Sequence, residues 1–334
     1  MDFSNLIEVS AYFSNTQNCL DYVEDLRWKG KPICMYCNHE KVYRIKSVKR
    51  FQCAKCNKQF SAIKGTIFES SQIPLQKWLV AMYILSSHKK GISSCQLAKD
   101  IGVTQKTAWY MLHRLRGSMV NKKNQELLTG VVELDETYMA RKYRTRYRGL
   151  SPEQSAKRDF IEQQRLKAGG SKTRTLGAVV GVKQRDGEVR LKAVAHATGE
   201  AIKDMVRANV HKDTLLMTDE SLRYRTALKT FRRKSVNHSK GEWVRDDVHT
   251  NGIENVWSVI KRGIYGIYHQ ISYKHLQNYC DEFSFRYNTR FLNDSVRFKG
   301  AFRNINNRVT FKELIADEED FLDQFFYSEK VKPK

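Results

Sequence analysis

The sequence predicts a multidomain α+β protein, and three observations in its 334 residues carry that prediction. Two Cys-X-X-Cys pairs lie close together near the N-terminus, a stretch with helical periodicity follows them, and the second half alternates between apolar strands and helices. The predicted order is a helical segment over 1–27, a small metal-bound module over 28–68, a helical domain over 69–122, an α/β domain over 126–295 and a tail over 296–334.

The composition favours a nucleic-acid partner. The net charge is +23, from 59 Lys and Arg against 36 Asp and Glu, and the excess lies within residues 1–240. A protein this basic repels itself unless a polyanion neutralises it, so nucleic acid is the expected partner, ahead of anionic lipid or an inert basic surface. A hydrophobic fraction of 41% is enough to build a folded core.

No segment of the sequence is expected to cross a membrane. The longest uncharged apolar stretch runs from Trp78 to His88 and is too short for a bilayer. The N-terminal residues lack the basic and apolar regions of a signal peptide. The expected location is the cytoplasm, in association with the nucleoid, where a reducing environment suits free thiols and thiolate metal sites.

Four of the seven cysteines have the spacing of a zinc ribbon. Cys34 and Cys37 form one pair, and Cys53 and Cys56 form a second pair after fifteen residues. Two such pairs close a tetrahedral zinc site, and four unrelated buried thiols are the alternative. A site with four thiolates has no open position, so the zinc is expected to be structural. The Lys and Arg of this module favour DNA over protein as its partner.

The next segment has the pattern of a helix-turn-helix. A helix begins near Pro74, a short helix over 93–101 then leads to a turn at Gly102, and Thr104 caps the following helix. In a helix-turn-helix, the second helix enters the major groove by its N-terminal end. An ordinary pair of packed helices has the same apolar spacing and is the alternative. The residues expected to face bases or phosphates are Gln105, Lys106 and Tyr110.

Three acidic residues interrupt apolar segments of the second half. Asp135 lies in one apolar strand, Asp219 closes a later strand, and Glu254 lies on a helix predicted to end at Gly263. A carboxylate in or at the end of a strand packs poorly, so it is either solvated or holds a cation. The alternatives are an N-cap role for Asp219 and a capping box in which Glu254 pairs with Asn251.

The predicted elements have the order of a ribonuclease-H-like fold: three strands, a helix, a strand and a helix. In that fold the first and fourth strands are neighbours, which would place Asp135 beside Asp219, with Glu254 opposite them. Three clustered carboxylates require cations, and hard oxygen ligands select Mg²⁺ or Mn²⁺. Two such ions could activate water or a 3′-hydroxyl and stabilise the leaving oxygen of a phosphodiester.

A strongly basic segment, 141–174, lies between the first two predicted strands, and Tyr is interleaved with Lys and Arg at its start. A solvated charge run is the usual explanation of such a segment. Interleaved Tyr and Arg beside a catalytic strand favour contacts with DNA phosphates or bases. The candidates are Arg141, Lys142 and Arg144.

The sequence resembles the DDE-type insertion-sequence transposases that carry an N-terminal zinc ribbon, in the branch related to the Merlin elements of eukaryotes. The resemblance rests on segments 134–137, 218–219 and 249–269, on the 34 residues between the second and third acidic residues, and on the cysteine module. It implies that Asp135, Asp219 and Glu254 form a catalytic triad that binds two Mg²⁺ or Mn²⁺ ions. It also implies that Lys261 contacts DNA near the scissile phosphate, with Arg262 beside it.

The implied function is that of a DNA transposase, which binds the terminal inverted repeats of its element, cuts each end and joins the freed 3′-hydroxyl to target DNA. Two ends must be held together, so a dimer or larger assembly is expected. Asn251 stays open as an alternative to Glu254, and Glu136 adjoins Asp135 but should face the other side of its strand. The alternative functions are a non-transposing nuclease or resolvase and a DNA-binding regulator with an inactive nuclease-like domain.

Overall fold

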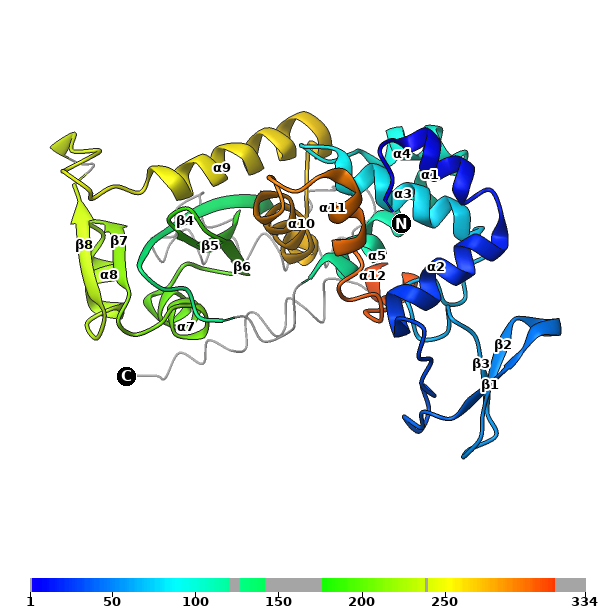
Figure 1. Cartoon of the computed structure of the whole chain (residues 1–334). Helices are drawn as coiled ribbons and strands as arrows, with labels where there is room; N and C mark the ends of the chain where they lie inside the picture. The colour runs from blue at the N-terminus through cyan, green and yellow to red at the C-terminus, as the bar shows by residue number, and fades with distance from the viewer. Residues whose placement is uncertain (1, 121–125, 142–175, 238–239, 316–334) are drawn as a thin grey trace, which may run out of the picture. The chain divides into compact units, whose positions relative to one another are not determined.

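The structure is a computed structural model that describes residues 2–120, 126–141, 176–237 and 240–315. The chain forms two compact units (Figure 1). Unit 1 comprises Met1–Asn124 and Asn288–Asp317, and unit 2 comprises Gln125–Tyr287.

Unit 1 combines a small antiparallel sheet, of order β1-β2-β3, with a group of helices. The strands are β1 (Val42–Ile45), β2 (Arg50–Cys53) and β3 (Gln59–Phe60), and the 3-10 turn η1 (Lys46–Val48) joins the first two. The helices are α1 (Leu6–Tyr12), α2 (Thr16–Trp28), α3 (Leu75–Ser87), α4 (Ser94–Ile101), α5 (Gln105–Met119), α11 (Asp294–Gly300) and α12 (Phe311–Ile315).

The predicted short helix, turn and second helix are present with their caps. The Ser93 hydroxyl accepts the Gln96 N–H at 3.1 Å and begins α4. Gly102 ends α4 with a φ of 61°, a left-handed conformation that suits glycine. The Thr104 hydroxyl accepts the Thr107 N–H at 3.2 Å and begins α5. Each boundary therefore follows from a local cap.

The segment after α10 returns to unit 1 and completes its core. Phe298 of α11 is fully buried, its ring stacks on Tyr22 at a centroid distance of 5.5 Å, and it meets Tyr83 edge-on at 5.7 Å. The prediction of a separate tail over 296–334 is wrong for residues 296–315, because their apolar side chains pack into the helical core.

Unit 2 is built on one five-stranded sheet of order β6-β5-β4-β7-β8. β6, β5 and β4 pair antiparallel, whereas β4, β7 and β8 pair parallel. The elements are β4 (Val131–Arg141), β5 (Leu176–Gln184), β6 (Val189–Val194), α7 (Gly199–Asn209), β7 (Leu215–Asp219), α8 (Leu222–Ala227), β8 (Arg232–Val236), α9 (Asn251–Gly263), the π-helical turn η4 (Ile264–Tyr268), η5 (Tyr273–His275) and α10 (Leu276–Asn288). Over the described ranges, no helix has the length and apolar character needed to cross a membrane.

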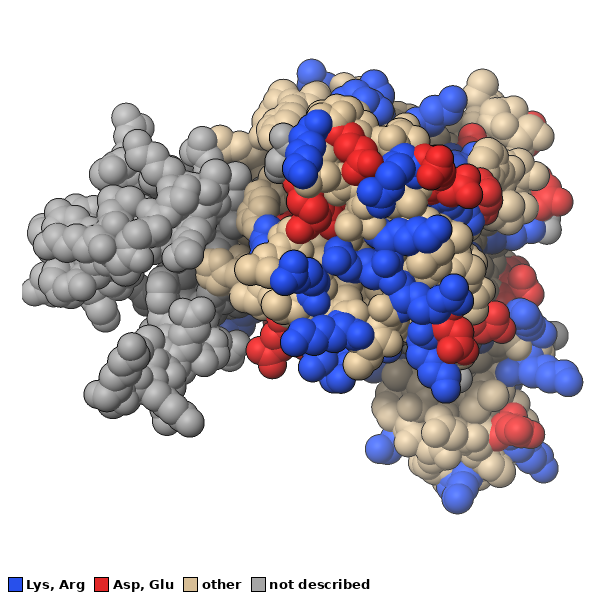
Figure 2. Space-filling model, turned by 90° about the vertical axis from the view of Figure 1, so that its left-hand side faces the viewer, with Lys and Arg blue, Asp and Glu red and all other residues tan. Residues whose placement is uncertain are grey.

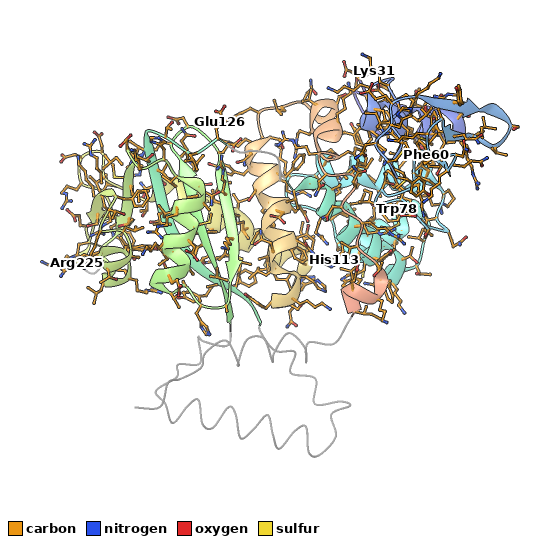
Figure 3. All side chains as sticks on the ribbon, turned by 90° about the horizontal axis from the view of Figure 1, so that it is seen from below. Lys31, Phe60, Trp78, His113, Glu126 and Arg225 are labelled. Carbon is orange, nitrogen blue, oxygen red and sulfur yellow. The ribbon has the colours of Figure 1, made fainter. Side chains whose placement is uncertain are left out.

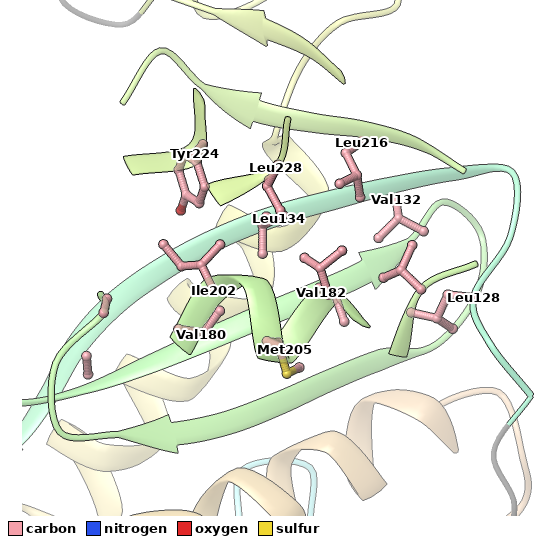
Figure 4. Packing of buried hydrophobic residues seen from close by; sticks show 14 residues of the cluster. Leu128, Val132, Leu134, Val180, Val182, Ile202, Met205, Leu216, Tyr224 and Leu228 are labelled. Atoms are coloured by element: carbon pink, nitrogen blue, oxygen red, sulfur yellow. The ribbon is translucent and has the colours of Figure 1, made fainter. Parts of the chain in front are cut away.

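Helices cover both faces of this sheet. On one face, alternate apolar residues of β4 and β5 pack under α7 and α8, with Leu134 and Val182 against Ile202 (Figure 4). On the other face, Val179 packs with α9 and α10. Because successive strand residues point to opposite faces, Asp135 shares its face of β4 with the α9 side.

α9 ends at Gly263, as predicted, but the chain continues directly into the π-helical turn η4. Gly263 has a helical φ of −66° and is buried, and the Ile264 N–H bonds to the carbonyls of both Ile260 and Lys261. Gly263 therefore ends the α-helical hydrogen-bond pattern without reversing the chain direction. The continuation extends the α9 surface by five residues, Ile264–Tyr268.

Candidate functional site

The four predicted zinc ligands converge in unit 1. Their Sγ atoms all lie within 4.8 Å of one another. The Sγ atoms of Cys34 and Cys56 are 3.7 Å apart, and those of Cys37 and Cys53 are 3.5 Å apart. A tetrahedron of zinc–sulfur bonds of about 2.3 Å places its sulfurs about 3.8 Å apart, so the four thiols fit one zinc ion.

The two cysteine pairs share one local geometry. Asn38 and Asn57 follow the pairs, both have a φ of 55°, and their N–H groups donate to the carbonyls of Cys34 and Cys53 at 2.9 and 3.1 Å. Asparagine tolerates this left-handed conformation better than most residues. Phe60, labelled in Figure 3, packs with Phe51 and with Cys34 and Cys53 in the core of the small sheet.

Asp135 lies on β4 under α9. Its Oδ2 accepts a hydrogen bond from Trp257 Nε1 at 2.9 Å. Asp135 is opposite Gly181 of β5, where a Cβ would come within 2.6 Å of the Trp257 ring. The glycine therefore lets the indole lie against the sheet and reach the carboxylate.

Burial raises the pKa of Asp135 to about 7. The negative charges of Glu136 and Asp219 act in the same direction, and the hydrogen bond from Trp257 acts in the opposite one. A half-buried carboxyl with two acidic neighbours is destabilised as an anion, and a divalent cation would relieve that cost. Asp135 thus fits the chemistry of a hard metal ligand.

Asp219 is the last residue of β7. β4 and β7 pair in parallel with Glu133 opposite Met217, and continuing this register brings Asp219 level with Asp135. Asp219 Oδ1 accepts the N–H of Ser221, the N-cap of α8, at 2.8 Å. The alternative of an N-cap role for Asp219 is wrong, because Ser221 is the N-cap of α8 and the Asp219 carboxylate accepts the N–H of that residue.

Glu254 lies in the first turn of α9. The Thr250 hydroxyl donates to Glu254 Oε1 at 2.7 Å, and Thr250 is the N-cap of α9. The expected capping box with Asn251 is thus replaced by a bond to Thr250. Asn251 is exposed.

The three predicted catalytic carboxylates are not as close to one another as the four cysteine thiols are. Over the described ranges, the cysteine cluster is the one group of Cys, His, Asp or Glu side chains close enough together to hold a metal ion. Asp135 and Glu254 line one pocket, whereas Asp219 is not among its lining residues. Asp219 is nevertheless near enough for its charge to raise the pKa of Asp135.

The pocket has a volume of about 770 Å³ and lies between β4 and α9 with its π-helical extension. Its lining combines acidic side chains with the basic Lys261 and Arg262 and the aromatic Trp257 and Tyr265. Trp257 was missed from the sequence, although its spacing from Glu254 places both on one helix face. The lining residues are Asp135, Glu136, Thr137, Glu254, Trp257, Ser258, Lys261, Arg262, Tyr265 and Gly266.

Glu136 makes its contacts with α8, on the other side of the strand from Trp257. Its carboxylate pairs with Arg223 at 2.5 Å and accepts a short hydrogen bond from the Tyr224 hydroxyl. Burial raises the pKa of Glu136, and Tyr224 and Arg223 oppose that effect. These partners tie α8, which directly follows Asp219, to β4.

A buried carboxylate holds the start of α9. Glu133, 1% exposed, accepts the Ile253 N–H at 2.8 Å and lies 3.4 Å from Arg185 Nε. A Cβ on Gly252 would come within 2.6 Å of the Glu133 carboxylate. Neither residue was predicted to matter for the site. Together they fix the helical turn that carries Glu254.

Of the three predicted DNA-reading residues of α5, Gln105 and Lys106 are exposed and Tyr110 is half-buried. Gln105 is exposed, and its amide donates to the Ser94 hydroxyl at 2.8 Å. Lys106 lies over the Phe311 ring of α12 at 5.1 Å. Tyr110 packs on the same ring at 5.7 Å and is half-buried, so its predicted exposure is wrong. No local pattern around Tyr110 predicts its contact with Phe311 of α12.

The predicted basic segment lies mostly outside the described residues. These include Lys142 and Arg144, and of Arg141 only the backbone, at the end of β4, is described. Another basic surface is visible on unit 2, where exposed Lys and Arg side chains gather over α8 and β8 (Figure 2). Its exposed members are Arg223, Arg225, Lys229, Arg232 and Lys234.

Comparisons with known proteins agree with the two units. Residues 127–288 match the ISXO2-like transposase domain, and residues 14–59 match the transposase zinc-ribbon domain. A protein described as uncharacterized, in the transposable element ISH50 of Halobacterium salinarum, is 27% identical over 263 residues, which is 75% of this chain and 83% of that protein.

A weaker likeness exists to a chain in a cryoEM structure of the simian T-cell lymphotropic virus intasome in complex with PP2A regulatory subunit B56 gamma. It is 16% identical and covers 55% of this chain and 60% of that chain, with a TM-score of 0.24, which is too low to carry a structural argument. The two domain matches and the ISH50 relative agree with the cysteine cluster and the mixed sheet. The chain therefore belongs to the insertion-sequence transposases that join a zinc ribbon to an ISXO2-like transposase domain.

Proposed function

We propose that this protein is a DDE-type transposase that binds the terminal inverted repeats of its insertion sequence, cuts DNA at each end and transfers the freed strands to target DNA. The observation that carries the proposal is the position of Asp135 on β4, whose parallel neighbour β7 ends in Asp219, and the raised pKa of Asp135 agrees with it. The strand order β6-β5-β4-β7-β8, with α9 on the Asp135 side, supports a ribonuclease-H-like fold.

Asp135, Asp219 and Glu254 would hold two Mg²⁺ or Mn²⁺ ions. Bound there, the ions would lower the pKa of an attacking water or 3′-hydroxyl and neutralise charge on the phosphodiester. Lys261 and Arg262, on the same pocket wall, would bind the phosphates of the strand being cut. A small rotation of each carboxylate away from Trp257, Ser221 and Thr250 would free it for this role.

Unit 1 would supply DNA recognition. The caps of α4 and α5 support a helix-turn-helix, and the ribbon would add basic contacts beside it. Because Phe311 covers Tyr110, the exposed Gln105 and the ammonium of Lys106 are the better candidates for base and phosphate contacts. A dimer or larger assembly would hold two element ends together, in association with the nucleoid.

The test is cleavage of DNA that carries the sequences flanking the gene, in Mg²⁺. We expect nicking at the element ends, followed by joining to a second DNA. Separate Asp135→Ala, Asp219→Ala and Glu254→Ala variants should abolish both steps and still bind DNA, whereas Asn251→Ala should cut normally. Unchanged nicking in the three acidic variants would refute the site. Nicking without joining would indicate a non-transposing nuclease, and binding without nicking a regulator.

A further inference from the structure

The far end of the pocket carries an exposed tyrosine on a well-anchored turn. Tyr265 of η4 lines the pocket and has 66% of its surface exposed. Its neighbours point inward: Ile264 is buried, and the Tyr268 hydroxyl donates at 2.7 Å to Glu282, which also accepts from Arg286 at 2.7 Å. The turn is therefore held by buried contacts while the Tyr265 ring is left accessible.

The next residue, Gly266, has no packing reason to be glycine. A Cβ there would meet nothing within 4 Å, whereas one at Gly181 or Gly252 would collide with neighbours. Its φ is not in the left-handed region either. Glycine weakens a helical turn relative to alanine, and π-helical turns recur at functional sites. A bare backbone beside an exposed aromatic ring suits the close approach of a ligand.

The pocket wall is ordered along the helix. Glu254 and Trp257 come first, and Trp257 is bound to Asp135; Lys261 and Arg262 follow, and Tyr265 comes last, after the two basic residues. Glu254 and Tyr265 are eleven positions apart, which corresponds to about 16 Å of helix. At the rise of about 3.4 Å per nucleotide of a duplex strand, that distance spans at most about five nucleotides, and fewer where the strand is extended.

From these features, and resting on the proposed function, we infer that Tyr265 stacks on an unpaired DNA base. The base belongs to the strand that is cut, within about five nucleotides of the phosphate at the carboxylates. Lys261 and Arg262 bind the phosphates between, and Gly266 lets the sugar–phosphate backbone approach the turn. Bases inside a duplex already stack on each other, so the ring needs a base freed at or near the DNA end.

An exposed tyrosine is common on protein surfaces and needs no explanation by itself. Tyr265 differs because it lines the pocket of the predicted active site, follows two cationic side chains and adjoins a glycine with open space above it. Those three features fit a nucleotide, which offers a phosphate and a flat ring together.

The experiment compares two DNA ends of the same sequence, with Ca²⁺ replacing Mg²⁺ to prevent cutting. One end is fully paired, and the other has five unpaired nucleotides on the strand that is cut. Tyr265→Ala should weaken binding of the unpaired end by about 5- to 150-fold, the loss expected for one stacked base, and leave the paired end nearly unchanged. Tyr265→Phe should keep most of the affinity. Phe291→Ala, which removes an exposed ring outside the pocket, is the control.

A second variant separates ligand contact from folding. Gly266→Ala should leave the melting temperature equal or higher, because its Cβ meets open space, and should still weaken binding of the unpaired end. Equal losses on both ends, or no loss in Tyr265→Ala, would overturn the stacking role. Cleavage by the wild-type protein in Mg²⁺ is measured separately. If the wild type cleaves DNA and Tyr265→Ala binds the unpaired end as the wild type does, only the stacking inference fails. If the wild type does not cleave DNA, the proposed function fails.

Discussion

The Asp135 side chain, which is proposed to bind metal, lowers the stability of the folded protein when it is ionised. Its pKa of about 7 lies above the ordinary value of 3.8, chiefly because the carboxyl is buried. The folded state therefore holds a proton that the unfolded state has lost between these two values. Stability falls as the pH rises through that window, and the full cost is present above pH 7.

Asp135→Asn should therefore stabilise the protein in Mg²⁺-free buffer at pH 8, by up to about 4 kcal/mol, while abolishing cleavage. Asn can still accept the Trp257 N–H bond. At pH 4 the difference should nearly vanish, because the wild-type carboxyl is then protonated in the folded state. Melting curves at both pH values measure the effect. A variant that is less stable than the wild type at pH 8 would show that burial does not dominate this site.

The seven cysteines should differ sharply in reactivity. Burial raises the pKa of Cys19 to about 11 and also raises that of Cys280, whereas Cys95 is exposed. Thiolates are the reactive species, so we expect Cys95 to be alkylated first at pH 8. The four ribbon thiols should react only after a chelator removes zinc, which mass spectrometry can follow as a step from one label to five. Labelling of ribbon thiols in the zinc-loaded protein would argue against the zinc site.

Among the elements, α9 carries one of the three predicted acids and depends on Glu133 for its position. The Glu133 carboxylate receives the Ile253 N–H, and Gly252 leaves room for it. Glu133, two residues before Asp135 on β4, therefore positions the helical turn that carries Glu254. Metal binding and the seating of this helix should be coupled.

Gly252→Ala tests that coupling. Its Cβ would lie 2.6 Å from the Glu133 carboxylate, so we expect a loss of about 1–3 kcal/mol in the free energy of unfolding and a higher Mg²⁺ requirement for cleavage. Gly199→Ala, in the first turn of α7, is the matched control, since its Cβ would make only an ordinary contact at 3.7 Å. Denaturant unfolding and Mg²⁺ titration measure the two effects. The same Mg²⁺ requirement in both variants would disprove the coupling.

Elements with strong local signals could be predicted from the sequence, and those set by distant contacts could not. The ribbon and the caps at Ser93 and Thr104 follow from spacing and side-chain chemistry. β8 was missed because Arg232–Val236 carries three charged residues in a row and forms the polar edge of the sheet. η4 was missed because Gly263 is a common helix stop, and no local pattern indicates that a π-helical turn follows it.

For the site, the sequence located the acidic residues but not the groups that position them. Trp257 and Glu133 act through atoms of residues more than a hundred positions away in the chain, and no local pattern indicates such pairs. Tyr110 was predicted from helix geometry to face the DNA groove, but its ring packs on Phe311, which is distant in the chain. The assignment of Asp219 and Glu254 to one metal site stays a prediction.

The chain as a whole leaves unit 1 before Gln125 and returns to it at Asn288. Phe298→Ala should therefore destabilise unit 1 by about 3–5 kcal/mol, since it removes a fully buried ring beside Tyr22. Hydrogen exchange, read separately for peptides of the two units, should show faster exchange in α2 and α3 and little change in β4 and β5. Equal changes in both units would mean that they unfold together.

Because the segment from Asn288 onward belongs to unit 1, unit 1 can complete its fold only late in synthesis. The ribosome releases Phe298 only after the whole sheet of unit 2 has been made, so the core around Tyr22 stays incomplete until then. A chain interrupted at a stop codon within the sheet would carry the ribbon and α5 without the helices that close their unit. Under the proposed function, such truncated products should be poor competitors for element ends.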